Sequence, residues 1–151
     1  MGVLVGACGK MARDWSLMMQ AEVGELSEPH EPGRGASSAM VHKRNPVAAM
    51  TALAAAHRVP HRVAALLACM PQEHERALGG WQAELAEWAG LWISAAGAVR
   101  ALADAAPGLV VHRGRLLANL EAHRGEFEID EALAAARRCT DAALESWKVS
   151  A

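Results

Sequence analysis

The chain has 151 residues, a formal net charge of −2 and a hydrophobic content of 52%. This length suits a single domain or part of one. The charge balance gives no electrostatic reason to expect binding to nucleic acid or to an anionic membrane. No apolar run is long enough to cross a bilayer, and the first residues lack the pattern of a signal segment. Three widely spaced cysteines, Cys8, Cys69 and Cys139, predict buried thiols in a reducing cytoplasm rather than a disulfide framework or zinc site.

Apolar residues recur at helical spacing through most of the chain, which predicts an all-α fold. The first helix is expected from about residue 2 to residue 26, before two prolines end the pattern. A long loop at 27–45 follows, and long loops in compact proteins are often functional. Pro46 suits the first turn of a helix at 46–70, for which Asn45 is a good N-terminal cap.

Further helices are expected at residues 72–105, 113–123 and 126–147. We find no alternating pattern of the kind that predicts strands, and no internal repeat. Alanine and leucine dominate these helices, and the helix at 46–70 is apolar on several faces. Because such helices cannot all bury their apolar faces within one short chain, we expect the protein to self-associate.

The most informative stretch is residues 33–46, GRGASSAMVHKRNP, in the long loop. It places two hydroxyl groups near a cationic pair and a helix start, an arrangement suited to a negatively charged substrate. An isolated serine is too weak a base at neutral pH. Ser37 therefore needs backbone donors, a nearby cation and the helix N-terminus to stabilise its alkoxide. A flexible Gly/Ser loop without chemistry is the alternative reading of the same composition.

This stretch resembles the signature loop of the fumarase/aspartase superfamily, usually Gly-Ser-Ser-x-Met-Pro-x-Lys-x-Asn-Pro. The sequence HKRNP at 42–46, with GKMARD at 9–14 and QEHERALGGW at 72–81, resembles the branch of bacterial 3-carboxy-cis,cis-muconate cycloisomerases. Two features depart from the pattern: Val41 and Ala36 replace the usual loop residues, and superfamily members are much longer. Residues matching the signature are Ser37, Ser38, Met40, Lys43, Asn45 and Pro46.

The resemblance extends over about residues 3–125. We therefore interpret residues 1–125 as part of the superfamily's helical domain, with the signature loop at 27–46. Residues 126–151 are interpreted as a C-terminal helix that diverges from the family, either after an internal deletion or as unrelated sequence.

The resemblance implies a cytoplasmic, cofactor-free enzyme without a metal, whose tetramers share a central helical bundle and build each active site from several subunits. The implied reaction is the intramolecular lactonisation of a muconate tricarboxylate through an aci-carboxylate intermediate. Ser37 is implied as the catalytic base, and Lys43 and Asn45 as the groups that stabilise the intermediate. The implied substrate-binding residues are Ser38, Met40, His42 and Arg44.

Two other functions remain open, because the regions that complete the superfamily's active site are not recognisable here. The chain could be a non-catalytic relative that acts as a helical oligomer or as a partner of a full-length enzyme. It could also be a module that binds di- or tricarboxylates without turnover. His57 and His61 have a spacing that can chelate zinc, but Pro60 distorts the turn and no third ligand is evident.

Overall fold

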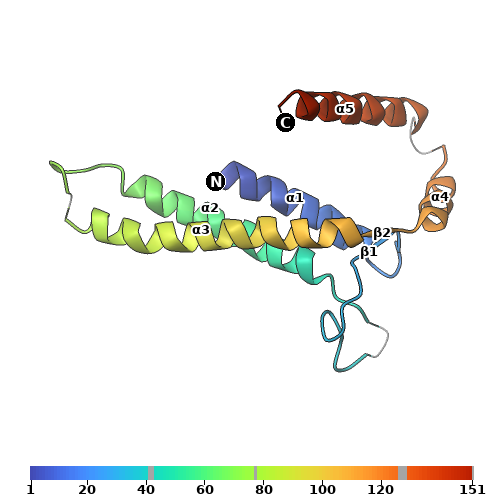
Figure 1. Cartoon of the computed structure of the whole chain (residues 1–151), viewed down its shortest axis with the longest axis horizontal. Helices are drawn as coiled ribbons and strands as arrows, with labels where there is room; N and C mark the ends of the chain where they lie inside the picture. Colours follow the sequence, from blue (N-terminus) through green and yellow to red (C-terminus); the bar gives the residue numbers. More distant parts are fainter. Residues whose placement is uncertain (41–42, 77, 126–128, 151) are drawn as a thin grey trace. The chain divides into compact units, whose positions relative to one another are not determined.

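The computed structural model describes residues 1–40, 43–76, 78–125 and 129–150. The chain divides into two compact units, Met1–His112 and Arg113–Ala151. The described residues form five α-helices, a short 3₁₀-helix at Ala106–Gly108 and one pair of two-residue strands (Figure 1). The predicted all-α class is confirmed. The boundary predicted near residue 125, which concerns the extent of the family resemblance, stays a prediction.

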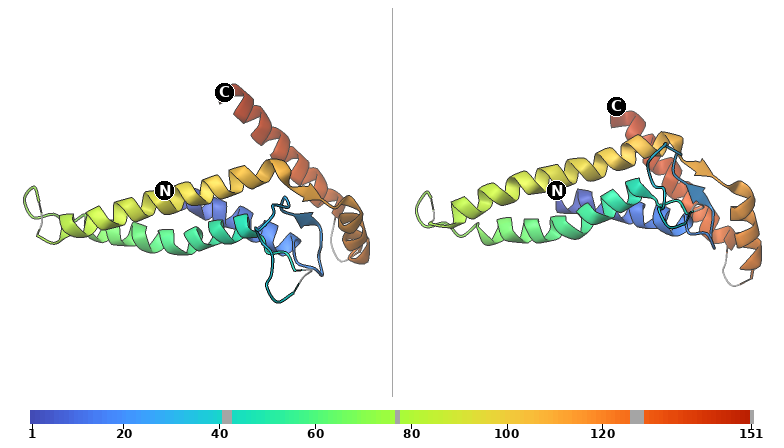
Figure 2. Two further views of the ribbon diagram at one scale, coloured as in Figure 1. Left: turned by 60° about the horizontal axis from the view of Figure 1, so that its bottom comes forward. Right: turned by 90° about the horizontal axis from the view of Figure 1, so that it is seen from below.

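Three helices build the first unit: α1 (Gly2–Met18), α2 (Val47–Ala68) and α3 (Gly80–Ala105). In all views α2 and α3 lie side by side, and α1 packs against both (Figures 1 and 2). The Arg62 guanidinium of α2 and the Glu87 carboxylate of α3 form a half-buried ion pair at 2.8 Å. The connection between α2 and α3 lies at one end of this unit, and the loop that precedes α2 lies toward the other (Figure 1).

Short side chains form most of the core of the first unit. The largest fully buried residues are Val5, Val59 and Leu91, and most other members of the core are alanines. Short side chains allow helices to approach closely, and Gly9 of α1 is the clearest case. A Cβ atom added at Gly9 would lie 2.5 Å from the Cβ atom of Ala56 in α2. The alanine-rich composition therefore leads to close helix packing rather than to a core of large side chains.

A two-stranded antiparallel ribbon was not expected from the sequence. Strand β1 (Leu26–Ser27) pairs with β2 (Val110–Val111), with Leu26 opposite Val111. The backbone N–H of His112 also donates to the Glu25 carbonyl at 2.9 Å. Two residues are too few to show an alternating pattern, so this pairing depends on where the helices end. It ties the start of the long loop to the segment that follows α3.

Two predicted helices are shorter than expected. The first ends at Met18 rather than near residue 26, and Gly24 adopts a φ of 62° in the turn that follows. The third begins at Gly80 rather than near residue 72, because the preceding segment contains His74 at φ 56° and Gly79 at φ 84°. A left-handed residue cannot continue a right-handed helix, so each segment is a turn. The helix predicted at 46–70 is confirmed.

The second unit contains α4 (Arg113–Ala122) and α5 (Ile129–Ser150). Helix α4 agrees with the prediction at 113–123. The start predicted for the last helix, at residue 126, lies outside the described residues. Cys8 and Cys69 are half-buried, whereas Cys139 of α5 is exposed, so the predicted burial of this third thiol is wrong. No helix in the described part of the chain is long and apolar enough to cross a membrane.

Substitution of Gly9 tests the close packing of α1 on α2. We expect Gly9→Ala to lower the free energy of unfolding by about 1–3 kcal/mol, because the added methyl group overlaps Ala56. Gly6 lies on the same helix with nothing within 4 Å of an added Cβ. Gly6→Ala should therefore raise stability by about 0.5–1 kcal/mol through helix propensity. Urea unfolding followed by circular dichroism measures both, and equal effects of the two substitutions would contradict the packing.

Candidate functional site

The loop before α2 is closed at its base by contacts between Gly35 and Asn45. The Asn45 backbone N–H donates to the Gly35 carbonyl oxygen at 2.8 Å, and its side-chain amide donates to the same oxygen at 3.4 Å. Ala36 and Arg44 form an antiparallel bridge beside this contact. Gly35 has a φ of 72°, and an added Cβ would lie 2.7 Å from the Asn45 carbonyl oxygen. A glycine is therefore required where the two arms of the loop meet.

Ser37 lies just beyond this base, in a turn that directs two backbone N–H groups at its hydroxyl. Its Oγ accepts hydrogen bonds from the N–H groups of Ala39 at 3.3 Å and Met40 at 3.1 Å. The Lys43 N–H in turn donates to the Met40 carbonyl at 3.1 Å. Donors aimed at an oxygen favour its charged form, so this turn supplies part of the stabilisation that a serine alkoxide needs.

The N-terminus of α2 is capped by Glu28, a residue far from it in sequence. One carboxylate oxygen, Oε2, accepts from the Ala48 N–H, and the other, Oε1, accepts from the Ala49 N–H, both at 3.0 Å. The cap predicted for Asn45 is wrong, because the Asn45 side chain is turned toward Gly35. Glu28 thus neutralises the positive N-terminus of α2. This is the helix end that is expected from the sequence to stabilise the Ser37 alkoxide.

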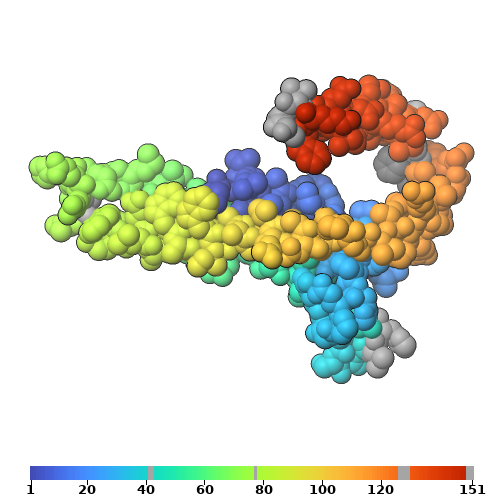
Figure 3. Space-filling model, in the orientation of Figure 1, coloured from blue at the N-terminus to red at the C-terminus, as the bar shows by residue number. Residues whose placement is uncertain are grey.

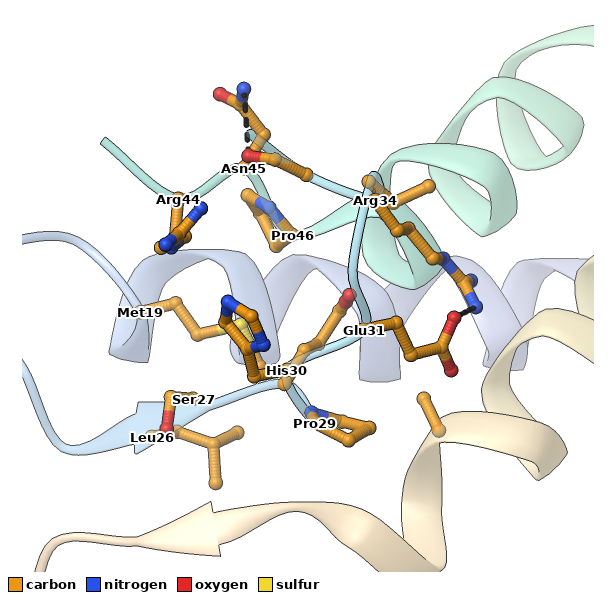
Figure 4. Close-up of a pocket in the computed structure, with 14 residues that line it drawn as sticks. Met19, Leu26, Ser27, Pro29, His30, Glu31, Arg34, Arg44, Asn45 and Pro46 are labelled. Atoms are coloured by element: carbon orange, nitrogen blue, oxygen red, sulfur yellow. Dashed lines mark hydrogen bonds and ion pairs between the residues drawn. The ribbon is translucent and has the colours of Figure 1, made fainter. Parts of the chain in front are cut away.

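A cavity of about 280 Å³ lies between the base of the loop, the end of β1 and α2 (Figure 4). Two of the predicted site residues, Arg44 and Asn45, line it. The other described candidates do not line it: Ser37 is half-buried in its turn, and Ser38, Met40 and Lys43 are exposed. His42 lies outside the described residues. The structure therefore separates the candidates into a cavity group and a group on the distal part of the loop.

Four ionisable residues of the cavity were not singled out from the sequence: Glu28, His30, Glu31 and Arg34. The Arg34 guanidinium donates to the Glu31 carboxylate at 3.0 Å. This hydrogen bond is the main cause of the raised pKa of Arg34; burial lowers that pKa, and the charges of Glu31, Glu28 and Asp104 raise it. The sequence signal near these residues is EPHEP at 28–32, in which each acid precedes a proline, and this pattern does not reveal a cavity.

The described residues contain no group of three or more His, Cys, Asp or Glu side chains placed to hold a metal ion. His57 and His61 are both exposed on α2.

No protein-family model matches the chain. Most of the chain is nevertheless similar in sequence to one part of several larger enzymes. The 3-carboxy-cis,cis-muconate cycloisomerase of Acinetobacter baylyi is 47% identical over 125 residues, which are 83% of this chain and 28% of that enzyme. The nitrosuccinate lyase of Streptomyces davaonensis is 42% identical over 132 residues, 87% of this chain and 28% of that enzyme. The chain thus spans less than a third of the length of these relatives.

Solved structures give the same result for the fold. The 3-carboxy-cis,cis-muconate lactonizing enzyme of Pseudomonas putida matches 97% of this chain and 36% of its own, with a TM-score of 0.74 and 38% identity. A fumarate lyase from a Mesorhizobium species matches 82% of this chain and 26% of its own, with a TM-score of 0.69 and 31% identity. These matches confirm the resemblance drawn from the signature loop.

Removal of the Glu28 charge tests the cap of α2. We expect Glu28→Gln to lower the free energy of unfolding by about 1 kcal/mol, because an amide offers one acceptor oxygen and no charge to the helix N-terminus. Glu75→Gln, at an exposed position in the connection before α3, is the matched control and should change stability by less than about 0.5 kcal/mol. Urea unfolding monitored by tryptophan fluorescence measures both. Equal unfolding midpoints for the two variants would contradict the capping role of Glu28.

Proposed function

Because the chain is related to one portion of the fumarase/aspartase superfamily enzymes, we propose that it carries the signature-loop chemistry of a 3-carboxy-cis,cis-muconate cycloisomerase. The observation that carries this proposal is the geometry at Ser37, whose Oγ accepts two backbone N–H groups. The 47% identity to the Acinetobacter cycloisomerase supports the choice of reaction. The substrate class is a muconate tricarboxylate.

In this reaction one substrate carboxylate adds to a carbon–carbon double bond and closes a lactone. The electron pair of the double bond moves onto the carbon beside a second carboxylate, which becomes an aci-carboxylate with two negative charges. A proton from solvent is then delivered to that carbon through Ser37, so the lactone dicarboxylate has one proton more and one negative charge fewer than the tricarboxylate substrate. Ser37 is the proton donor in this direction and, by microscopic reversibility, the base in the reverse direction.

The remaining loop residues are assigned either to stabilise the intermediate or to bind the substrate. The Lys43 ammonium and the Asn45 amide stabilise the extra charge of the aci-carboxylate, since fixed donors aimed at developing charge lower the barrier. Ser38, Met40, His42 and Arg44 bind the substrate, and Arg44 is suited to a carboxylate by its planar, bidentate guanidinium. No cofactor or metal takes part in these steps.

We also propose that the active form is a cytoplasmic homo-oligomer, a tetramer by analogy with the superfamily, and helix α3 supports the self-association. Large apolar side chains that are each more than 40% exposed lie along one face of α3, at successive spacings of four, three, four and seven residues. These residues, the α3 stripe, are Trp81, Leu85, Trp88, Trp92 and Val99. Figure 3 shows α3 along the surface of the first unit. Such a stripe is typical of a surface that another copy covers.

One observation favours a second candidate function. The chain spans about 28% of the length of the cycloisomerases it resembles. A superfamily active site needs further segments, so a non-catalytic carboxylate-binding module, or a partner of a full-length enzyme, is the alternative.

Substitution of the proposed base tests the reaction. We expect Ser37→Ala to abolish turnover, measured as loss of the ultraviolet absorbance of the muconate diene, while circular dichroism shows unchanged helical content. Ser16→Ala is the control, because this hydroxyl only donates to the Arg13 carbonyl within α1. It should leave turnover unchanged. Equal turnover by Ser37→Ala would remove Ser37 from the mechanism. Absence of turnover by the unmodified oligomer would favour the non-catalytic alternative.

The α3 stripe makes a separate prediction about assembly. We expect native mass spectrometry to find a homo-oligomer and Trp92→Glu to shift it toward monomer, because a buried charge without a partner opposes association. Ala86→Glu adds the same charge at an exposed position of α3 outside the stripe and should leave the mass unchanged. A monomeric unmodified chain, or an equal shift in both variants, would contradict the role of the stripe.

A further inference from the structure

We propose that the cavity beside the loop base is a carboxylate-binding subsite in which Arg44 and His30 hold the anion. The proposal rests on the function proposed above for the class of ligand, and it adds His30 and a location to that function. Figure 4 shows the cavity and the side chains that line it. The charged groups that line the cavity differ in whether a neighbouring group already compensates their charge.

The first acidic group of the cavity, Glu28, is compensated by the backbone. Both of its carboxylate oxygens accept N–H groups from the first turn of α2, at 3.0 Å each. The partial positive charge of the helix N-terminus, about half an elementary charge, offsets part of the charge of this carboxylate. Two consequences follow: Glu28 repels an incoming anion less than a bare carboxylate would, and the helix N-terminus itself is not available to that anion.

The second acidic group, Glu31, is compensated by a side chain. Its carboxylate forms an ion pair with Arg34 at 3.0 Å, which is the first cause of the raised pKa of Arg34. Arg34 and Glu31 together therefore contribute no net charge to the cavity. Arg34 is engaged on this side and is not the first choice for a ligand-binding cation.

Arg44 and His30 are the basic groups that remain. Both line the cavity, and neither forms an ion pair with another residue in the described part of the chain. Figure 4 shows the Arg44 side chain and the His30 imidazole among the side chains that line the cavity, one from each arm of the loop. A guanidinium binds a carboxylate through two parallel hydrogen bonds, and an imidazole N–H can add a third.

The remaining lining suits the carbon skeleton of a small acid. Met19, Leu26 and Pro29 give the cavity an apolar wall, and Leu26 is only 6% exposed. A volume of about 280 Å³ is at the small end of ligand pockets, which favours a small di- or tricarboxylate over a larger cofactor. Ser37 and Lys43 do not line the cavity, whereas Asn45 does. The subsite therefore adjoins the reacting centre at Asn45 but does not include the proton donor. Its role is recognition of the additional carboxylate rather than proton transfer.

Titration calorimetry with propane-1,2,3-tricarboxylate tests the subsite, since this saturated acid has no double bond and binds without turnover. We expect the unmodified chain to bind it, and Arg44→Gln and His30→Gln each to weaken binding about tenfold. Propionate, with a single carboxylate, should bind the unmodified chain more weakly than the tricarboxylate does. Arg13→Gln is the matched control, because it removes an exposed charge of α1 outside the cavity, and its binding should equal that of the unmodified chain.

The results of these titrations test the subsite independently of the proposed reaction. Tricarboxylate binding that is retained in Ser37→Ala but weakened in Arg44→Gln and His30→Gln supports the subsite, whether or not the chain turns over a muconate. No heat with the unmodified chain overturns it, as do unchanged affinities in both cavity variants. An equal loss of affinity in Arg13→Gln also overturns it, because binding would then reflect overall charge alone. Circular dichroism of each variant confirms that its fold is intact.

Discussion

The arrangement of the first unit depends on how closely α1 and α2 approach. Gly9 and Ala56 meet where even one added methyl group would overlap, and alanines form most of the surrounding core. Close packing of short side chains gives many small dispersion contacts and leaves little freedom for one helix to slide on the other. The position of α1 therefore sets where the chain leaves it, and the position of α2 sets where the long loop must end.

Glu28 links the position of α2 to the conformation of the loop. Its carboxylate reaches the first turn of α2 from a segment that follows β1, and so joins the two ends of the loop. The contacts between Gly35 and Asn45 close the loop a second time, nearer to Ser37. These interactions place Ser37 and the cavity residues in two different parts of the loop. Ser37 lies in a turn with its own backbone donors, while Arg44 and His30 lie in a cavity whose acidic groups are already compensated.

Particular residues show where sequence reasoning succeeded and where it did not. The helix at 46–70 was predicted well because Pro46 and a long apolar run are local signals. The early end of α1 and the late start of α3 were missed because the left-handed conformations of Gly24, His74 and Gly79 are properties of the folded turns. The predicted cap at Asn45 was wrong for a similar reason. The Asn45 amide donates to the Gly35 carbonyl, ten residues earlier, and the Glu28 carboxylate caps the helix instead.

The sequence by itself determined the helical class, the resemblance of residues 33–46 to the superfamily loop, and the residues proposed for the reaction. These conclusions depend on the local spacing and the chemistry of residues, and both can be read from the sequence without knowledge of the fold. Only the tertiary structure decided that Glu28 caps α2, that Arg34 is paired with Glu31, and that His30 shares a cavity with Arg44. The physical reason is that charge compensation depends on distances between segments, and helix packing, not sequence separation, sets those distances.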